Sequence, residues 1–216
     1  MKMQQPTYVH ENEKLNPFFS IWLSTRKTIR YVLENKSLKY ALIIAAIAGI
    51  PNGFNAFGSL SSSFNFSFLV LLLASLFIGP LLSLFGVGLS SLIFTFVGKW
   101  MGGVGTFGEM AKAMGVVTIP AIWLSPYFII SSIITYNGNQ IDPLSGFSAS
   151  MIIWMIFSAL FMIVFAIWMI VIQSQSIGEV HQFSSWRGFA TLMIPSIVFF
   201  IIAFIVIMMF FAAVVI

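Results

Sequence analysis

Long apolar stretches alternate with short polar segments along most of this sequence. A helix needs about 20 mainly apolar residues to cross the hydrocarbon core of a bilayer. Five stretches meet that requirement, so we predict an all-α membrane protein: a five-helix transmembrane bundle over residues 40–216. The predicted spans are about 40–57, 67–97, 110–134, 150–172 and 189–216.

The second stretch is longer than a bilayer requires. As one helix, residues 67–97 would extend about 46 Å, and they contain Gly79-Pro80. A chain reversal at this apolar site would leave backbone groups unsatisfied in lipid. We therefore expect one long, kinked and tilted helix, with a re-entrant break at Gly79-Pro80 as the alternative.

The charged residues support this count. Charged side chains make up only 7% of the chain, too few to cover a water-exposed globule. With five spans and a cytoplasmic N-terminus, all ten Lys and Arg residues fall on the inner side, as the positive-inside rule requires. Splitting the second stretch would move Lys99 and Lys112 outside. We predict a multi-pass protein of the cell membrane with an extracytoplasmic C-terminus.

The segment before the first span divides into two parts. Residues 1–14 are polar, and we expect a disordered cytoplasmic tail. Residues 15–39 combine an Asn16-Pro17 helix start with apolar residues at helical spacing and a basic cluster, which predicts an amphipathic interfacial segment of one or two helices. Its basic residues are expected either to contact anionic lipid headgroups or only to fix topology. The candidate lipid- or partner-contacting residues are Trp22, Arg26, Lys27, Arg30 and Arg187.

Small residues recur every four positions in the first two spans. Such stripes let helix backbones approach closely, and intramolecular packing is the default interpretation, with homo-oligomerisation left open. The stripes contain Ala41, Ala45, Gly49 and Gly53, and Ser75, Gly79 and Ser83, with Pro80 beside them.

Candidate chemistry is sparse. The chain contains no cysteine, and no ionisable residue falls securely inside a span, so we expect no enzyme, no metal and no cofactor. Residues 103–108 match G-x-G-x-x-G, but a membrane helix precedes them where a nucleotide site needs a strand; we expect a tight turn instead. Glu179 and His181 are expected to be exposed polar residues. The basic residues are few and serve topology, so nucleic acid is not an expected partner.

Three groups of residues carry a family resemblance. The first is Asn16-Pro17-Phe18-Phe19-Ser20-Ile21-Trp22 with Arg26-Lys27-Thr28-Ile29-Arg30. The second is Gly102-Gly103-Val104-Gly105-Thr106-Phe107 followed by Gly115 and Pro120, and the third is residues 178–187. Together they resemble bacterial membrane proteins with the Yip domain, the family of Ypt/Rab-interacting membrane proteins. The resemblance covers roughly residues 15–216 and implies five spans with a cytoplasmic N-terminus in the bacterial cytoplasmic membrane.

The sequence departs from the family pattern at several positions. Ser24-Thr25 replaces a common Arg-Pro, Val116 replaces a tyrosine, and the D-L-Y-G-P element is absent. Direct Rab binding is therefore not implied.

Two functions compete on this evidence. The leading hypothesis is a non-catalytic scaffold or adaptor whose cytoplasmic face meets a protein partner or lipid headgroups. The alternative is a permease or lipid-translocating protein for a neutral or amphipathic molecule, favoured by the broken second span and by serines at membrane depth. Those serines can equally serve helix packing.

Overall fold

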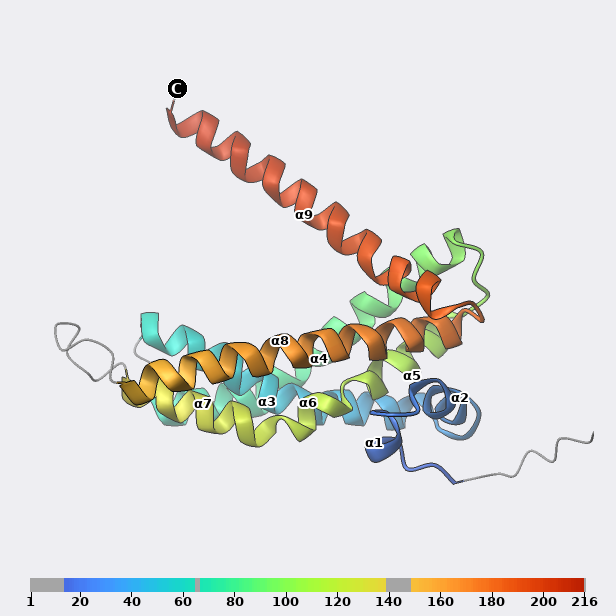
Figure 1. Cartoon of the computed structure of the whole chain (residues 1–216), viewed down its shortest axis with the longest axis horizontal. Coiled ribbons are helices and arrows are strands. Elements are labelled where there is room, and N and C mark those ends of the chain that lie inside the picture. Colours follow the sequence, from blue (N-terminus) through green and yellow to red (C-terminus); the bar gives the residue numbers. More distant parts are fainter. Residues whose placement is uncertain (1–13, 65–66, 139–148, 216) are drawn as a thin grey trace, which may run out of the picture.

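The computed structural model describes residues 14–64, 67–138 and 149–215, and the regular secondary structure in these ranges is helical. Figure 1 shows the helices with their labels. Their bounds are α1 Pro17–Ser20, α2 Thr25–Asn35, α3 Leu38–Phe64, α4 Phe68–Trp100, α5 Phe107–Val117, α6 Ile119–Trp123, α7 Ser125–Gly138, α8 Ala149–Val180 and α9 Ser185–Val215.

Four of these helices are long and apolar enough to cross a membrane by themselves: α3, α4, α8 and α9. A fifth span results if α5, α6 and α7 are taken together as one broken crossing. The all-α membrane class is therefore confirmed, and the described chain has four candidate spans, or up to five.

The predicted third span is not the single helix that its hydropathy suggested. It is divided into α5, α6 and α7, with a 52° bend between Phe107–Trp123 and Ser125–Ser131. Pro126 has no N–H to donate to the carbonyl of Ile122. The Ser125 hydroxyl donates to that carbonyl instead, over 2.6 Å. Proline chemistry thus accounts for the break.

The second span is one continuous helix, α4, which runs through Gly79-Pro80. Its small residues pack against those of α3. A Cβ atom on Gly49 would come within 2.5 Å of the Gly79 carbonyl oxygen, so these two backbones touch. The Ser83 hydroxyl donates to the Ala45 carbonyl over 2.6 Å, and Gly53 lies against Ser75 and Gly79. The stripes therefore serve packing between α3 and α4.

The N-terminal segment forms two helices, α1 and α2. The Asn16 side chain accepts from the Phe18 amide, and Pro17 opens α1, as predicted. The apolar face of α2 does not face lipid, however: Ile29 and Val32 are fully buried and belong to the same core cluster as Met110 and Ile177. The ends of α5 and α8 offer α2 an apolar surface within the protein, so its apolar face is covered by protein.

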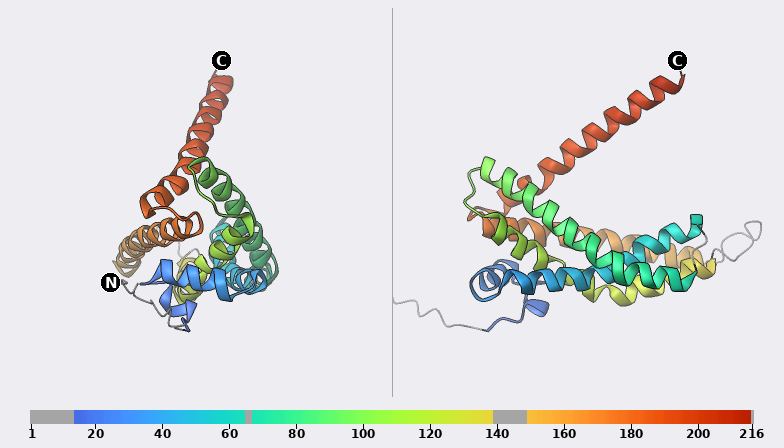
Figure 2. Two further views of the ribbon diagram at one scale, coloured as in Figure 1. Left: turned by 90° about the vertical axis from the view of Figure 1, so that its right-hand side faces the viewer. Right: turned by 180° about the vertical axis from the view of Figure 1, so that it is seen from behind.

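The long helices of the bundle lie alongside one another, with the exception of α9. Figures 1 and 2 show α3, α4 and α8 running alongside α5–α7, while α9 leaves the bundle towards the C-terminus. Its apolar side chains are almost entirely exposed, which a bilayer tolerates because lipid is its solvent. Helix α2 packs on α5 and α8 at one end of the bundle.

Candidate functional site at the ends of α4 and α8

Helices α4 and α8 end in the same backbone motif, side by side. In α4, Gly102 has φ +85° and the Gly103 amide donates to the Gly98 carbonyl. In α8, Gln182 has φ +57° and the Phe183 amide donates to the Gly178 carbonyl. A residue in the left-handed region followed by this bond is the Schellman motif, which ends a helix and satisfies its last carbonyls. The expected glycine turn is therefore present and leads directly into α5.

His181 joins the two helix ends. It is 1% exposed, and its Nδ1 accepts from the Gly105 amide over 3.1 Å. Its Nε2 lies 3.1 Å from the Phe94 carbonyl oxygen, so the neutral tautomer with the proton on Nε2 satisfies both contacts. The ring stacks on Phe183 at 5.4 Å.

The glycines around this ring leave room for it. A Cβ atom added to Gly98 or Gly103 would strike the His181 ring, and one added to Gly105 would strike Val180 and come 3.0 Å from His181 Nδ1. We name His181, Phe94 and these three glycines the histidine clamp. The pKa of His181 is lowered, chiefly by burial of the ring. The hydrogen bond with the Phe94 carbonyl opposes this shift, the charge of Lys99 adds to it, and the charge of Glu109 opposes it. The expectation that His181 is an exposed polar residue was wrong, because the glycines beside it open a pocket that the ring fills.

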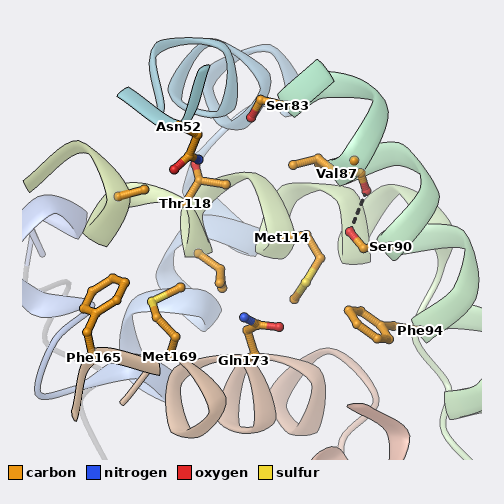
Figure 3. Close-up of a pocket in the computed structure, with 13 residues that line it drawn as sticks. Asn52, Ser83, Val87, Ser90, Phe94, Met114, Thr118, Phe165, Met169 and Gln173 are labelled. Atoms are coloured by element: carbon orange, nitrogen blue, oxygen red, sulfur yellow. Dashed lines mark hydrogen bonds between the residues drawn. The ribbon is translucent and has the colours of Figure 1, made fainter. Parts of the chain in front are cut away.

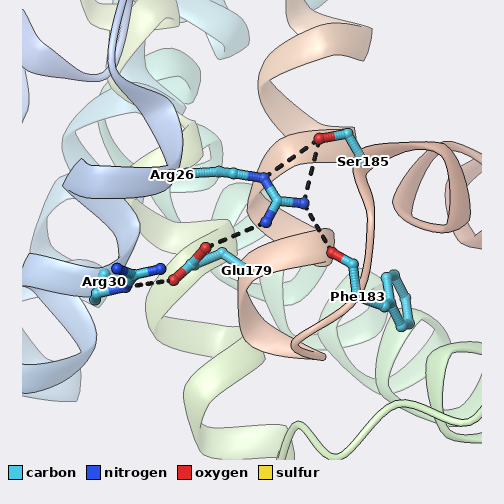
Figure 4. Close-up of polar contacts among 5 residues, drawn as sticks. All are labelled: Arg26, Arg30, Glu179, Phe183 and Ser185. Carbon is cyan, nitrogen blue, oxygen red and sulfur yellow. Dashed lines mark hydrogen bonds and ion pairs between the residues drawn. The ribbon is translucent and has the colours of Figure 1, made fainter.

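Two arginines of α2 converge on one carboxylate of α8, as Figure 4 shows. The Glu179 side chain is 9% exposed and lies 2.7 Å from Arg30 Nε and 3.4 Å from Arg26 Nη1. Arg26 also donates to the Phe183 carbonyl and to the Ser185 hydroxyl. We name these five residues the arginine–glutamate cluster. It ties α2 to the turn between α8 and α9.

This cluster changes the interpretation of the basic segment. The Arg26 guanidinium is engaged with Glu179, Phe183 and Ser185. Hydrogen bonding and charge attraction from Glu179 raise the pKa of Arg30, whose side chain remains 61% exposed. Lys27 and Arg187 are exposed. Trp22 is half-buried with its ring 6.5 Å from that of Phe165.

The remaining predicted residues serve as structural positions. Phe107 begins α5 and is exposed. Gly115 lies against the Ala41 backbone, where a Cβ would be 2.6 Å from the carbonyl oxygen, so it brings α5 onto α3. Pro120 is buried at the start of α6. Gly102 supplies the positive φ of the turn.

A separate cavity of about 380 Å³ lies between α3, α4, α5–α6 and α8. Figure 3 shows Asn52 and Thr118 on one side of it and Gln173 on the helix opposite. Its lining combines amides and hydroxyls with aromatic and thioether side chains. It consists of Asn52, Ser83, Gly86, Val87, Ser90, Phe94, Met114, Val117, Thr118, Ala121, Phe165, Met169 and Gln173.

The sequence pattern did not predict the central residues of the histidine clamp, the arginine–glutamate cluster or the cavity. Their sequence context predicts that Glu179 and His181 are exposed polar residues, and it gives Asn52 no special role. The signal for the cluster was the combination of arginines on α2 with an isolated carboxylate near the end of α8. Within the described residues, no group of three His, Cys, Asp or Glu could hold a metal ion.

Several apolar helices of membrane length, capped at one end by the histidine clamp and the arginine–glutamate cluster, define an integral membrane protein with an all-helical domain. The sequence model of the Yip1 domain matches residues 19–208, and the chain belongs to this family. The comparisons with curated proteins and with solved structures gave no match.

Proposed function

We propose that the chain is a non-catalytic membrane scaffold or adaptor of the bacterial branch of the Yip-domain family. It acts in the bacterial cytoplasmic membrane with its N-terminus inside, and presents its cytoplasmic face to protein partners or anionic lipid headgroups. A homo-oligomer would display several such faces.

One observation carries the proposal: the charged residues of the described chain gather at one end of the bundle. They lie before α1, on α2, around the start of α3, at the end of α4, in the first half of α5, and around the turn between α8 and α9. The cluster and the clamp join these segments to one another. Lys and Arg outnumber Glu there, and a basic surface attracts acidic partners and anionic headgroups.

The exposed residues at this end suit recognition. Lys27, Lys99 and Arg187 are exposed beside the exposed aromatic rings of Trp100 and Trp186. Aromatic side chains and arginine are enriched where proteins bind partners, and Trp also favours the membrane interface. Because Arg26 holds α2 on the bundle, this surface needs little ordering when it binds.

Site-specific photo-cross-linking in native membranes tests the proposal. A photoreactive residue at Lys27 or Arg187 is expected to give discrete adducts with a protein or with anionic lipid, whereas the same residue at exposed Ala149, at the start of α8, is not. Arg187→Glu should weaken adducts formed from position 27, because both residues contribute to one basic surface. The same products at all three positions would reject the scaffold proposal.

The cavity favours the second candidate, a permease or lipid-translocating protein for a neutral or amphipathic molecule. All its lining residues lie in candidate spans or in the bent α5–α7 pair. Transbilayer movement of a fluorescent phospholipid in reconstituted vesicles is the direct measurement. Movement no faster than in protein-free vesicles rejects translocation of phospholipid.

A further inference from the structure

The cavity between α3, α4, α5–α6 and α8 contains two amide side chains without partners. Among the described residues, neither the Asn52 nor the Gln173 side chain makes a hydrogen bond, and they line the cavity from different helices. Each belongs to a candidate membrane span. An amide without a partner in an apolar medium costs several kcal/mol, so these groups favour a ligand that supplies hydrogen-bonding atoms.

The three hydroxyl groups that line the cavity already donate hydrogen bonds, but their oxygens can still accept one. Ser83, Ser90 and Thr118 donate their protons to the carbonyls of Ala45, Val87 and Gly115 respectively. A hydroxyl oxygen that has donated its proton can still accept a hydrogen bond. The cavity therefore offers two NH₂ donors together with hydroxyl and amide oxygens that accept.

The cavity carries no formal charge on any of its lining residues. A phosphate inside it would face no cation at membrane depth, which is costly. Around the polar atoms lie the apolar side chains of Phe94, Phe165 and Met169. The volume of about 380 Å³ lies within the range of about 300–1,000 Å³ that small-molecule sites occupy.

The cavity communicates with the surface, since Asn52 and Gly86 are both exposed. Because its walls are helices of membrane-spanning length and composition, we expect molecules to enter it from the bilayer. Gln173 precedes Glu179 by six residues on α8, which places it about 9 Å deeper than the arginine–glutamate cluster. This is one or two turns below the charged end of the bundle.

We propose that this cavity binds the glycerol-ester end of an uncharged lipid of the diacylglycerol class. The ester carbonyls accept from the Asn52 and Gln173 amides, and the free hydroxyl donates to a serine or threonine oxygen. The acyl chains leave through the opening into the bilayer. The site goes beyond the scaffold function and requires no transport.

Photolabelling of the full-length protein in phosphatidylcholine vesicles tests the proposal. The probe is a diacylglycerol with a photoreactive acyl chain, and the comparison probe is phosphatidic acid with the same chain, which differs only by its phosphate. Diacylglycerol should label the segments around Met114 and Met169 at least about tenfold more than phosphatidic acid, since about 1.4 kcal/mol suffices for that ratio. Equal labelling by both probes would overturn the choice of an uncharged lipid.

Two glycines of α4 provide a matched pair of variants. A Cβ on Gly86 or on Gly88 meets no atom within 4 Å, so both positions have room for a side chain, but only Gly86 lines the cavity. Gly86→Phe should abolish the labelling and Gly88→Phe should leave it unchanged. Labelling that persists in Gly86→Phe, or that falls mainly on the exposed residues of α9, would reject the site as bulk lipid contact.

The amides are tested by Asn52→Leu and Gln173→Leu. Each should reduce labelling about fivefold, the equivalent of one lost hydrogen bond, while the protein keeps its melting temperature or gains stability. Wild-type labelling in the double variant would show that the amides do not hold the lipid.

Discussion

Single side chains at the charged end of the bundle decide how the helices meet. His181 fills a space that Gly98, Gly103 and Gly105 leave open, and Glu179 accepts from two arginines of α2. Both residues lie in the ten-residue polar segment that resembles the family. The clamp and the cluster together join α2, α4, α5 and α8.

The clamp makes stability depend on pH. Burial lowers the pKa of His181 below its ordinary value of about 6.5, so the unfolded state binds this proton more tightly than the folded state. The contribution is complete above pH ~6.5 and is lost as the pH falls towards the folded-state pKa. We expect the melting temperature in nanodiscs to fall between pH 7.5 and 5.5. His181→Gln should lower it at both pH values and reduce this slope. His10→Gln, in the N-terminal tail that the sequence predicts to be disordered, should leave the slope intact.

The cluster is tested by Glu179→Gln. The amide keeps the shape but loses the charge that both guanidinium groups use, so we expect a loss of about 1–2 kcal/mol in the free energy of unfolding. Detergent titration measures it. Glu34→Gln is the control, because Glu34 is an exposed glutamate on α2 and should change stability by no more than about 0.5 kcal/mol. If Glu179→Gln lowers the free energy of unfolding no more than Glu34→Gln does, the cluster does not stabilise the protein.

At the scale of elements, backbone contact holds α3 and α4 together. Gly49 and Gly79 face each other without side chains between them, and van der Waals packing of this kind replaces the hydrophobic effect in lipid. The opposite case is α9, which leaves the bundle and exposes nearly all its apolar residues.

The contact between α3 and α4 is tested by Gly79→Ala. The added methyl group would strike the Gly49 backbone, and we expect a loss of about 1–3 kcal/mol. Gly88→Ala, on the same helix but with open space around it, should be neutral or gain up to about 1 kcal/mol, since alanine is the better helix former. Thermal melting of the two proteins in the same detergent makes the comparison. A Gly79→Ala protein as stable as wild type would contradict the close approach.

At the scale of the whole molecule, the two ends of the bundle differ in character. One holds the described charges, the clamp and the cluster. Away from it, aromatic rings pair between helices: Phe54 of α3 meets Phe68 of α4, and Tyr127 of α7 meets Trp154 of α8. We expect the charged end to face the cytoplasm, since Lys and Arg favour the inner side of a membrane.

Cysteine accessibility checks the orientation, since the chain has no cysteine of its own. Lys27→Cys and Lys99→Cys should resist a membrane-impermeant maleimide in intact cells and react after the cells are opened. Ser67→Cys and Ala149→Cys, at the starts of α4 and α8, should react in intact cells. Labelling of Lys99→Cys and Ser67→Cys on the same side would contradict the continuous crossing of α4.

Local signals in the sequence determined the membrane class and the Asn16-Pro17 helix start, and they favoured a continuous α4 and close packing of small residues. These features depend on hydropathy, on capping and on spacing within one helix, which neighbouring residues set. The tertiary structure alone decided that Arg26 and Arg30 meet Glu179 about 150 positions away, that His181 is buried, and that Asn52 and Gln173 line one cavity. A polar residue in the sequence looks the same whether it ends in water, in lipid or against a partner, because burial depends on which helices pack together.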